Sequence, residues 1–124
     1  MNTQRLYILF VEDEPQFSYL IQRYAARSGF ELLNTSKVSE IIILAKQWQP
    51  KVVIVDIDTP GLDTTKVLGQ LRTDAVTRHI PIVLCSSSES VLLRWELEVD
   101  GSWLKPVLYD DFANTLAAMG IYTT

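Results

Sequence analysis

The sequence lacks several features that would assign it to particular classes of protein. Its only cysteine, Cys85, excludes an internal disulfide, and His79 has no second histidine with which to share a metal. Only 11 basic residues stand against 15 acidic ones, and they do not cluster, which argues against a nucleic-acid-binding face. No apolar run approaches the ~20 residues of a membrane span, and the N-terminus has no signal-peptide pattern. We therefore expect a cytoplasmic protein that contacts neither nucleic acid nor membranes.

The remaining composition is ordinary for a globular protein. The 124 residues are 48% hydrophobic and 21% charged, and the formal net charge is −4. A chain of this length buries roughly two thirds of the surface that its unfolded form exposes. Residues 1–124 are accordingly predicted to form one domain. Cys85 lies inside an apolar run and is expected to be a buried thiol in a reducing compartment.

Apolar runs without a polar face predict strands that are buried on both sides of a parallel sheet. The clearest run is Val52–Val55, which leads directly into Asp56. Three further runs and one less apolar stretch complete the predicted strands, which are 6–11, 30–35, 52–56, 80–85 and 102–104.

Helical periodicity follows each of these strands. Pro15 suits the first turn of the first helix. Ser36, Asp63 and Asp110 are expected to cap the second, third and last helices. A shorter helix is predicted over 90–98, which gives five repeats of a strand followed by a helix.

Strands that alternate with helices predict a parallel sheet with right-handed crossovers. The fold class is therefore α/β: a three-layer (βα)5 sandwich of the flavodoxin-like type, with a doubly wound five-stranded parallel sheet of order 2-1-3-4-5. Ligands bind such sheets at the carboxyl ends of the strands, at the switch point between the first and third. Glu12 and Asp13 end the first strand, and Asp56 ends the third.

Carboxylates that meet at one sheet edge repel one another unless a cation is bound. A few oxygen ligands with room for water suit Mg²⁺, and an aspartate beside such a metal can act as a nucleophile toward a phosphoryl group. A hydroxyl and a fixed cation would be needed to hold the phosphoryl oxygens, and Ser86 and Lys105 end the fourth and fifth strands. Each residue alone has an ordinary explanation as a cap or a solvated side chain, but the set points to phosphoryl chemistry.

Four segments resemble, in order and spacing, the receiver domain of two-component response regulators. They are FVEDEP, VVIVDIDTPGLD, IPIVLCS and WLKP, and the resemblance covers nearly the whole chain. It implies that Asp56 accepts a phosphoryl group from a histidine kinase, a phosphotransfer protein or a small phosphodonor. A downstream protein target or a fused output domain would receive the signal. The chain would not otherwise be an enzyme, beyond its own phosphorylation and dephosphorylation.

The same resemblance implies roles for the other site residues. Asp13 would ligate Mg²⁺ directly, Glu12 would act through water, and the main-chain carbonyl of Asp58 would complete the protein ligands together with Asp56. Ser86 and Lys105 would each bind a phosphoryl oxygen. Rearrangement of the fourth helix and fifth strand would carry the signal.

Two departures from the family's pattern concern the predicted signalling segment. Ser102 stands where the family usually has an aromatic residue, and Trp103 is expected to face the other way because side chains alternate along a strand. The segment is also about three residues short, close to one helical turn. We therefore expect a clipped or irregular fourth helix, with Trp95 packed in the core.

Asp58 is a third departure, because it adds a carboxylate beside the phosphoryl site. Its side chain is expected either to change phosphoryl lifetime or Mg²⁺ affinity, or to be a solvated turn residue.

Two other functions also stay open. Asp56 to Thr59 looks like the DxDxT motif of haloacid-dehalogenase-type phosphatases. In those enzymes, however, the acidic pair comes last in the chain, whereas here it comes first. A pseudo-receiver would keep the fold without a phosphate switch, which Ser102 and the short helix favour.

Overall fold

Five strands and five helices alternate along residues 5–121, the part of the chain that this computed structural model describes. The first four and last three residues of the predicted 1–124 domain lie outside the described residues. The elements are β1 (Tyr7–Val11), α1 (Pro15–Arg27), β2 (Glu31–Thr35), α2 (Val38–Trp48), β3 (Val52–Asp56), α3 (Thr64–Thr73), β4 (Ile82–Ser86), α4 (Glu89–Arg94), β5 (Gly101–Leu104) and α5 (Tyr109–Ala118).

The five strands form one parallel sheet in the order β2-β1-β3-β4-β5, which confirms the predicted topology. β1 and β3 lie side by side at the centre, with Val11 paired to Val55. β4 lies on the other side of β3, with Cys85 paired to Asp56. The carboxyl ends of these three strands therefore meet at one edge.

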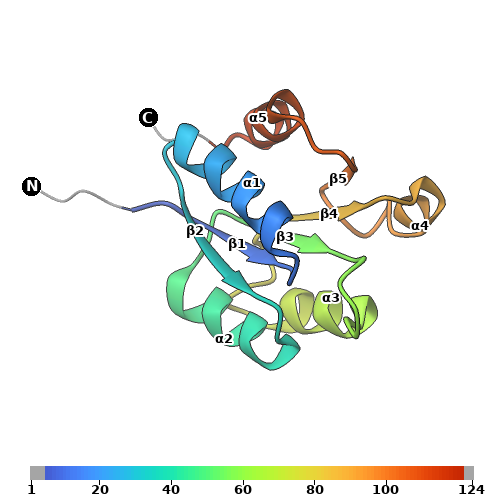
Figure 1. The fold of residues 1–124 in the computed structure, drawn as a ribbon. Coiled ribbons are helices and arrows are strands. Elements are labelled where there is room, and N and C mark those ends of the chain that lie inside the picture. Colours follow the sequence, from blue (N-terminus) through green and yellow to red (C-terminus); the bar gives the residue numbers. More distant parts are fainter. Residues whose placement is uncertain (1–4, 122–124) are drawn as a thin grey trace, which may run out of the picture.

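Helices cover both faces of the sheet, as expected for the three-layer architecture. In Figure 1, α1 and α5 lie on one side, and α2 and α3 lie on the other. Phe10, Ile54 and Phe112 belong to the buried cluster under α1 and α5. Leu9 and Leu71 belong to the cluster under α2 and α3. No helix within 5–121 is both long enough and apolar enough to span a bilayer.

Several predictions about single side chains are confirmed. Cys85 is fully buried, and His79 is exposed. Trp103 is 4% exposed and donates its indole N–H to the Thr115 hydroxyl at 2.8 Å, whereas Ser102 is exposed. Trp95, expected in the core, is only half-buried and packs against the outside of the cluster under α2 and α3.

The predicted helix 90–98 is wrong at both ends, although the expectation of a clipped helix is confirmed. The Ser88 hydroxyl accepts the Val91 N–H at 3.3 Å, so α4 begins at Glu89. After Arg94 the chain changes to tighter turns, in which the Glu98 N–H donates to the Trp95 carbonyl at 2.9 Å.

Two predicted caps are also wrong, because other residues, Lys37 and Leu108, stand at the N-cap positions. At α2 the N-cap is Lys37 rather than Ser36, and the Thr35 hydroxyl accepts the Lys37 N–H at 3.1 Å. At α5 the Asp111 carboxylate, rather than Asp110, accepts the Leu108 N–H at 2.9 Å. The other two predictions are confirmed: the Asp63 carboxylate accepts the Lys66 N–H at 3.1 Å, and Pro15 begins α1.

Candidate functional site

The candidate site lies at the carboxyl edge of the sheet and is centred on Asp56. This residue ends β3 and is 3% exposed. The Lys105 ammonium donates to both of its carboxylate oxygens, at 2.9 and 3.0 Å. The Asp58 N–H donates to one of them at 3.0 Å. The structure thus brings together the predicted phosphoacceptor and the predicted lysine.

Lys105 is held in place from several directions. It follows β5, its N–H donates to the Ser86 carbonyl at 2.9 Å, and its peptide bond to Pro106 is cis. The ammonium lies 4.8 Å from the centre of the Phe17 ring, a cation–π distance. Burial lowers the pKa of Lys105, but its hydrogen bonds and ion pairs with Asp56 and Asp58 outweigh burial and raise it above 10.5. This side chain is a fixed positive charge at neutral pH.

The acidic corner after β1 supplies two more carboxylates. Glu12 is 2% exposed, and its Oε1 has no hydrogen-bond partner. Burial raises the pKa of Glu12; the Glu14 N–H opposes this effect, and the negative charges of Asp56, Glu14 and Asp13 add to it. Asp13 itself is exposed. A buried carboxylate beside like charges, with an unused oxygen, is chemically suited to a nearby cation or water.

The carboxylates at this edge do not form a closed metal cage. Within residues 5–121, no three Asp, Glu, His or Cys side chains group closely enough to hold a metal by themselves. Mg²⁺ usually keeps several waters and takes only one or two carboxylates. The exposed Asp13, the unpartnered Glu12 oxygen and the charge of Asp56 therefore fit a hydrated divalent cation.

Ser86 lies at the site, but its hydroxyl points to Asp58 rather than to Asp56. The residue ends β4, is fully buried, and donates to Asp58 Oδ1 at 2.7 Å. Asp58 Oδ2 accepts the Ser87 N–H at 2.8 Å and the Lys105 ammonium at 3.2 Å. Desolvation raises the pKa of Asp58, but these hydrogen bonds outweigh it and hold the pKa below 3.8. Asp58 is thus an exposed turn residue, as one of the two expectations had it, but its carboxylate is hydrogen-bonded to Ser86, Ser87 and Lys105 rather than to water alone.

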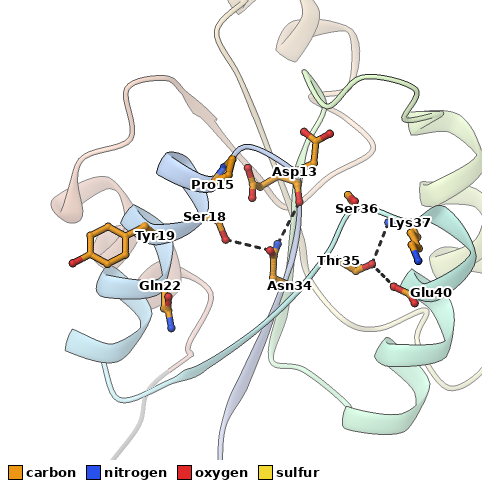
Figure 2. A pocket seen from close by; sticks show the side chains of 11 residues that line it. Asp13, Pro15, Ser18, Tyr19, Gln22, Asn34, Thr35, Ser36, Lys37 and Glu40 are labelled. Atoms are coloured by element: carbon orange, nitrogen blue, oxygen red, sulfur yellow. Dashed lines mark hydrogen bonds between the residues drawn. The ribbon is translucent and has the colours of Figure 1, made fainter.

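A solvent-open cavity of about 650 Å³ lies beside the acidic corner, where α1, β2 and the start of α2 meet (Figure 2). Glu12 and Asp13 line one end of it. The Asn34 amide donates to the Phe10 carbonyl at 2.9 Å and so braces the end of β1. The cavity leaves the acidic corner accessible to ions and water from this side.

Sequence reasoning missed two contributors to the site. Ser87 donates both its N–H and its hydroxyl to Asp58, and the run of three serines after β4 was the available signal. Phe17 is an apolar residue of α1 with no sequence signal for a role at the site, whereas its ring contacts the Lys105 ammonium. In both cases the contact joins segments that lie far apart in the chain.

Comparisons with known proteins agree with the fold. The model of the response regulator receiver domain family matches residues 8–116. Protein PilH of Pseudomonas aeruginosa is 31% identical over 98 residues, which cover 79% of this chain and 75% of PilH. The alkaline phosphatase synthesis transcriptional regulatory protein PhoP of Bacillus subtilis is 30% identical over 100 residues. That match covers 80% of this chain but only 42% of PhoP.

Solved structures add a likeness of fold. The receiver domain of the sensor histidine kinase PA1611 from Pseudomonas aeruginosa superposes with a TM-score of 0.78, covering 94% of this chain and 99% of that one. At 18% identity, this likeness concerns the fold alone. That structure has a magnesium ion coordinated in its active site cleft.

Proposed function

The chain belongs to the response regulator receiver domain family, and from this premise we propose that it is a phosphoacceptor whose phosphorylation on Asp56 controls a protein–protein interaction. Receiver domains are signalling domains of two-component systems. The observation that supports the proposal most is the contact of the Lys105 ammonium with both oxygens of the buried Asp56 carboxylate, at 2.9 and 3.0 Å. A fixed cation there neutralises charge that a bound phosphoryl group would add.

The proposed reaction is a transfer of a phosphoryl group to an Asp56 oxygen. That oxygen attacks the phosphorus of a phosphohistidine, the new P–O bond forms, and the P–N bond breaks. The electron pair stays on the departing imidazole nitrogen, which then takes a proton from water. Lys105 and the Ser86 hydroxyl hold oxygens of the transferred group. Hydrolysis of the aspartyl phosphate restores Asp56, and no other turnover is proposed.

The proposal includes Mg²⁺, as in the PA1611 receiver structure. Asp13 and Asp56 would ligate it directly, together with the main-chain carbonyl of Asp58, and Glu12 would act through water. When bound, the metal supplies charge neutralisation at the phosphoryl oxygens. The unpartnered Oε1 of Glu12 supports its part, because a metal-bound water would give this buried oxygen a hydrogen-bond donor.

The partners follow from the same proposal. A histidine kinase or a phosphotransfer protein would supply the phosphoryl group in the cytoplasm. A downstream protein target or a fused output domain would respond to it.

The test is incubation of the full chain with acetyl phosphate and Mg²⁺. Intact mass should increase by one phosphoryl group in the wild type and in Asp63→Asn, which alters a carboxylate outside the site. The increase should be absent in Asp56→Asn and in excess EDTA. Modification of Asp56→Asn to the same extent would contradict the proposal, because the phosphoryl group would then be on another residue.

A pseudo-receiver is the second candidate, and one observation favours it. The Ser86 hydroxyl and the Lys105 ammonium already bind the Asp58 carboxylate, so the unmodified chain satisfies groups that a phosphoryl group would need. The absence of any Asp56-dependent change in mass or tryptophan fluorescence would favour this candidate. The phosphatase alternative would need Asp58 as a general acid, and its lowered pKa leaves it ionised at neutral pH.

A further inference from the structure

The Asp58 carboxylate is bound by donors as a small anion would be. Oδ1 accepts the Ser86 hydroxyl at 2.7 Å. Oδ2 accepts the Ser87 N–H at 2.8 Å, the Ser87 hydroxyl at 3.1 Å and the Lys105 ammonium at 3.2 Å. A hydroxyl, a backbone N–H and an ammonium that converge on two oxygens form a general binding site for anionic oxygens.

Two of these donors are the groups that the proposed function assigns to the phosphoryl group on Asp56. Lys105 contacts Asp56 and Asp58 at once, at 2.9 and 3.2 Å. Ser86 has a single hydroxyl proton, so it cannot donate to Asp58 and to a phosphoryl oxygen at the same time. The two anions must therefore compete for the Ser86 hydroxyl.

We propose that the Asp58 carboxylate is an intramolecular competitor of the phosphoryl group, which occupies the phosphoryl-oxygen donors and must leave them when Asp56 is phosphorylated. The inference rests on the proposed function and adds to it a residue that sets how tightly the site accepts its ligand. Asp58 would weaken binding of the phosphoryl group because its carboxylate occupies the donors of Ser86, Ser87 and Lys105, and not because it changes binding of the metal.

Asp58 is the partner that can move. Its side chain is 33% exposed and lies in the turn after β3, whereas Ser86 is fully buried and Lys105 is held by Asp56. Rotation about the side-chain bonds of Asp58 carries its carboxylate into water without moving the backbone. The main-chain carbonyl of Asp58, which the proposed function assigns to Mg²⁺, stays in place during this rotation.

The inference is tested by titrating the full chain with beryllofluoride, a phosphoryl mimic formed from BeCl₂ and NaF, at saturating MgCl₂. Binding is followed by tryptophan fluorescence and by calorimetry. Asp58→Asn and Asp58→Ala should bind roughly tenfold more tightly than the wild type, the scale of one charge-assisted hydrogen bond. Both variants keep the main-chain carbonyl.

Two control variants define the effect. Asp63→Asn makes the same change in net charge near the site while an asparagine preserves the cap of α3, so it should bind as the wild type does. Asp56→Asn should not bind at all. Thermal unfolding checks that each variant is folded, and if Asp58→Ala is not, the isosteric Asp58→Asn decides the question.

The outcomes separate this inference from the proposed function. Equal or weaker binding by the Asp58 variants would overturn the inference alone, and so would an equal gain in Asp63→Asn, which would reveal a general charge effect. A gain confined to subsaturating Mg²⁺ would assign the effect to the metal and would also overturn it. Binding by none of the proteins, the wild type included, would overturn the proposed function and the inference with it.

Discussion

The central strands and the α4–β5 edge of the same sheet are packed to different degrees. Every residue of β3 and β4 is buried, and these strands end in Asp56 and Ser86. In β5 only Trp103 is buried, and Leu97 in the preceding turns is 99% exposed. Two of the residues proposed to carry the chemistry, Asp56 and Ser86, therefore end fully buried strands, whereas Lys105 directly follows the edge strand β5. The segment proposed to report the chemistry is held by fewer contacts and is easier to move.

The largest expected effect is a loss of stability in the central strands, which is compared with the loss from a substitution at the α4–β5 edge. Ile54→Ala removes a fully buried side chain from β3 and should lower the free energy of unfolding by about 2–5 kcal/mol. Leu97→Ala should change it by no more than about 0.5 kcal/mol, because this side chain is already in water. Urea unfolding followed by tryptophan fluorescence measures both. Similar losses would show that the edge is packed as firmly as the centre.

A smaller effect is expected where β5 is attached to α5. Thr115→Val removes the acceptor of the Trp103 indole N–H and leaves a buried donor unsatisfied, at a cost of about 1–3 kcal/mol. Thr115→Ser keeps the hydroxyl and should lose clearly less. If both variants unfold at the same urea concentration, this hydrogen bond does not hold the edge strand.

A stabilising effect of about 1 kcal/mol or less is expected at the end of β1, where Glu12→Gln removes a buried charge. Burial, opposed by the Glu14 N–H and supported by the charges of Asp56, Glu14 and Asp13, holds the folded-state pKa of Glu12 above 4.5. As the pH rises, Glu12 thus loses its proton at a lower pH in the unfolded chain than in the folded one. The stability of the wild type therefore falls as the pH rises from 4.5 through the folded-state pKa.

The glutamine variant lacks this fall in stability. Its advantage should be absent below pH 4.5 and complete at neutral pH. Thermal unfolding in EDTA at several pH values checks the prediction. An advantage of the same size at every pH would mean that the charge of Glu12 is not its cause.

The smallest effect is expected at Ser102. Ser102→Tyr restores the aromatic residue usual in the family, and because the position is exposed it should change stability by no more than about 0.5 kcal/mol. Ser102→Ala provides the control for loss of the hydroxyl. A loss well above 1 kcal/mol in the tyrosine variant would show that this face of β5 is packed and would weaken the contrast with the central strands.

Among the central strands, β1 and β3 were predicted to within one residue of their observed bounds, whereas β4, predicted over 80–85, lies at Ile82–Ser86. An apolar run that stops at a polar residue reveals both the buried strand and the side chain at its end, which located Glu12, Asp56 and Ser86. The regular alternation of strands and helices predicted the parallel sheet, and the order 2-1-3-4-5 is a common order of doubly wound sheets. These signals are local or depend only on the order of the elements, so a single sequence contains them.

What the sequence could not reveal depends on contacts between loops. The Ser86 hydroxyl binds Asp58 across two strand ends, and no spacing along the chain encodes that distance of 2.7 Å. The caps of α2 and α5 were misplaced because the observed N-cap residues, Lys37 and Leu108, are not residue types that favour this position. α4 is shorter than its periodicity indicated, since Leu97 faces solvent rather than the core.

The rate at which the Cys85 thiol is alkylated can serve as a measure of motion around the sheet. The thiol is fully buried in β4, beside Asp56 in the register, and its sulfur lies 3.7 Å from the Val55 carbonyl oxygen. Burial raises the pKa of Cys85 well above 9.0, so an alkylating reagent should react only when the packing of the cluster under α1 and α5, to which the thiol belongs, transiently opens. The labelling rate should therefore report how often this packing opens, and a ligand bound at Asp56 should slow that rate in proportion to its occupancy.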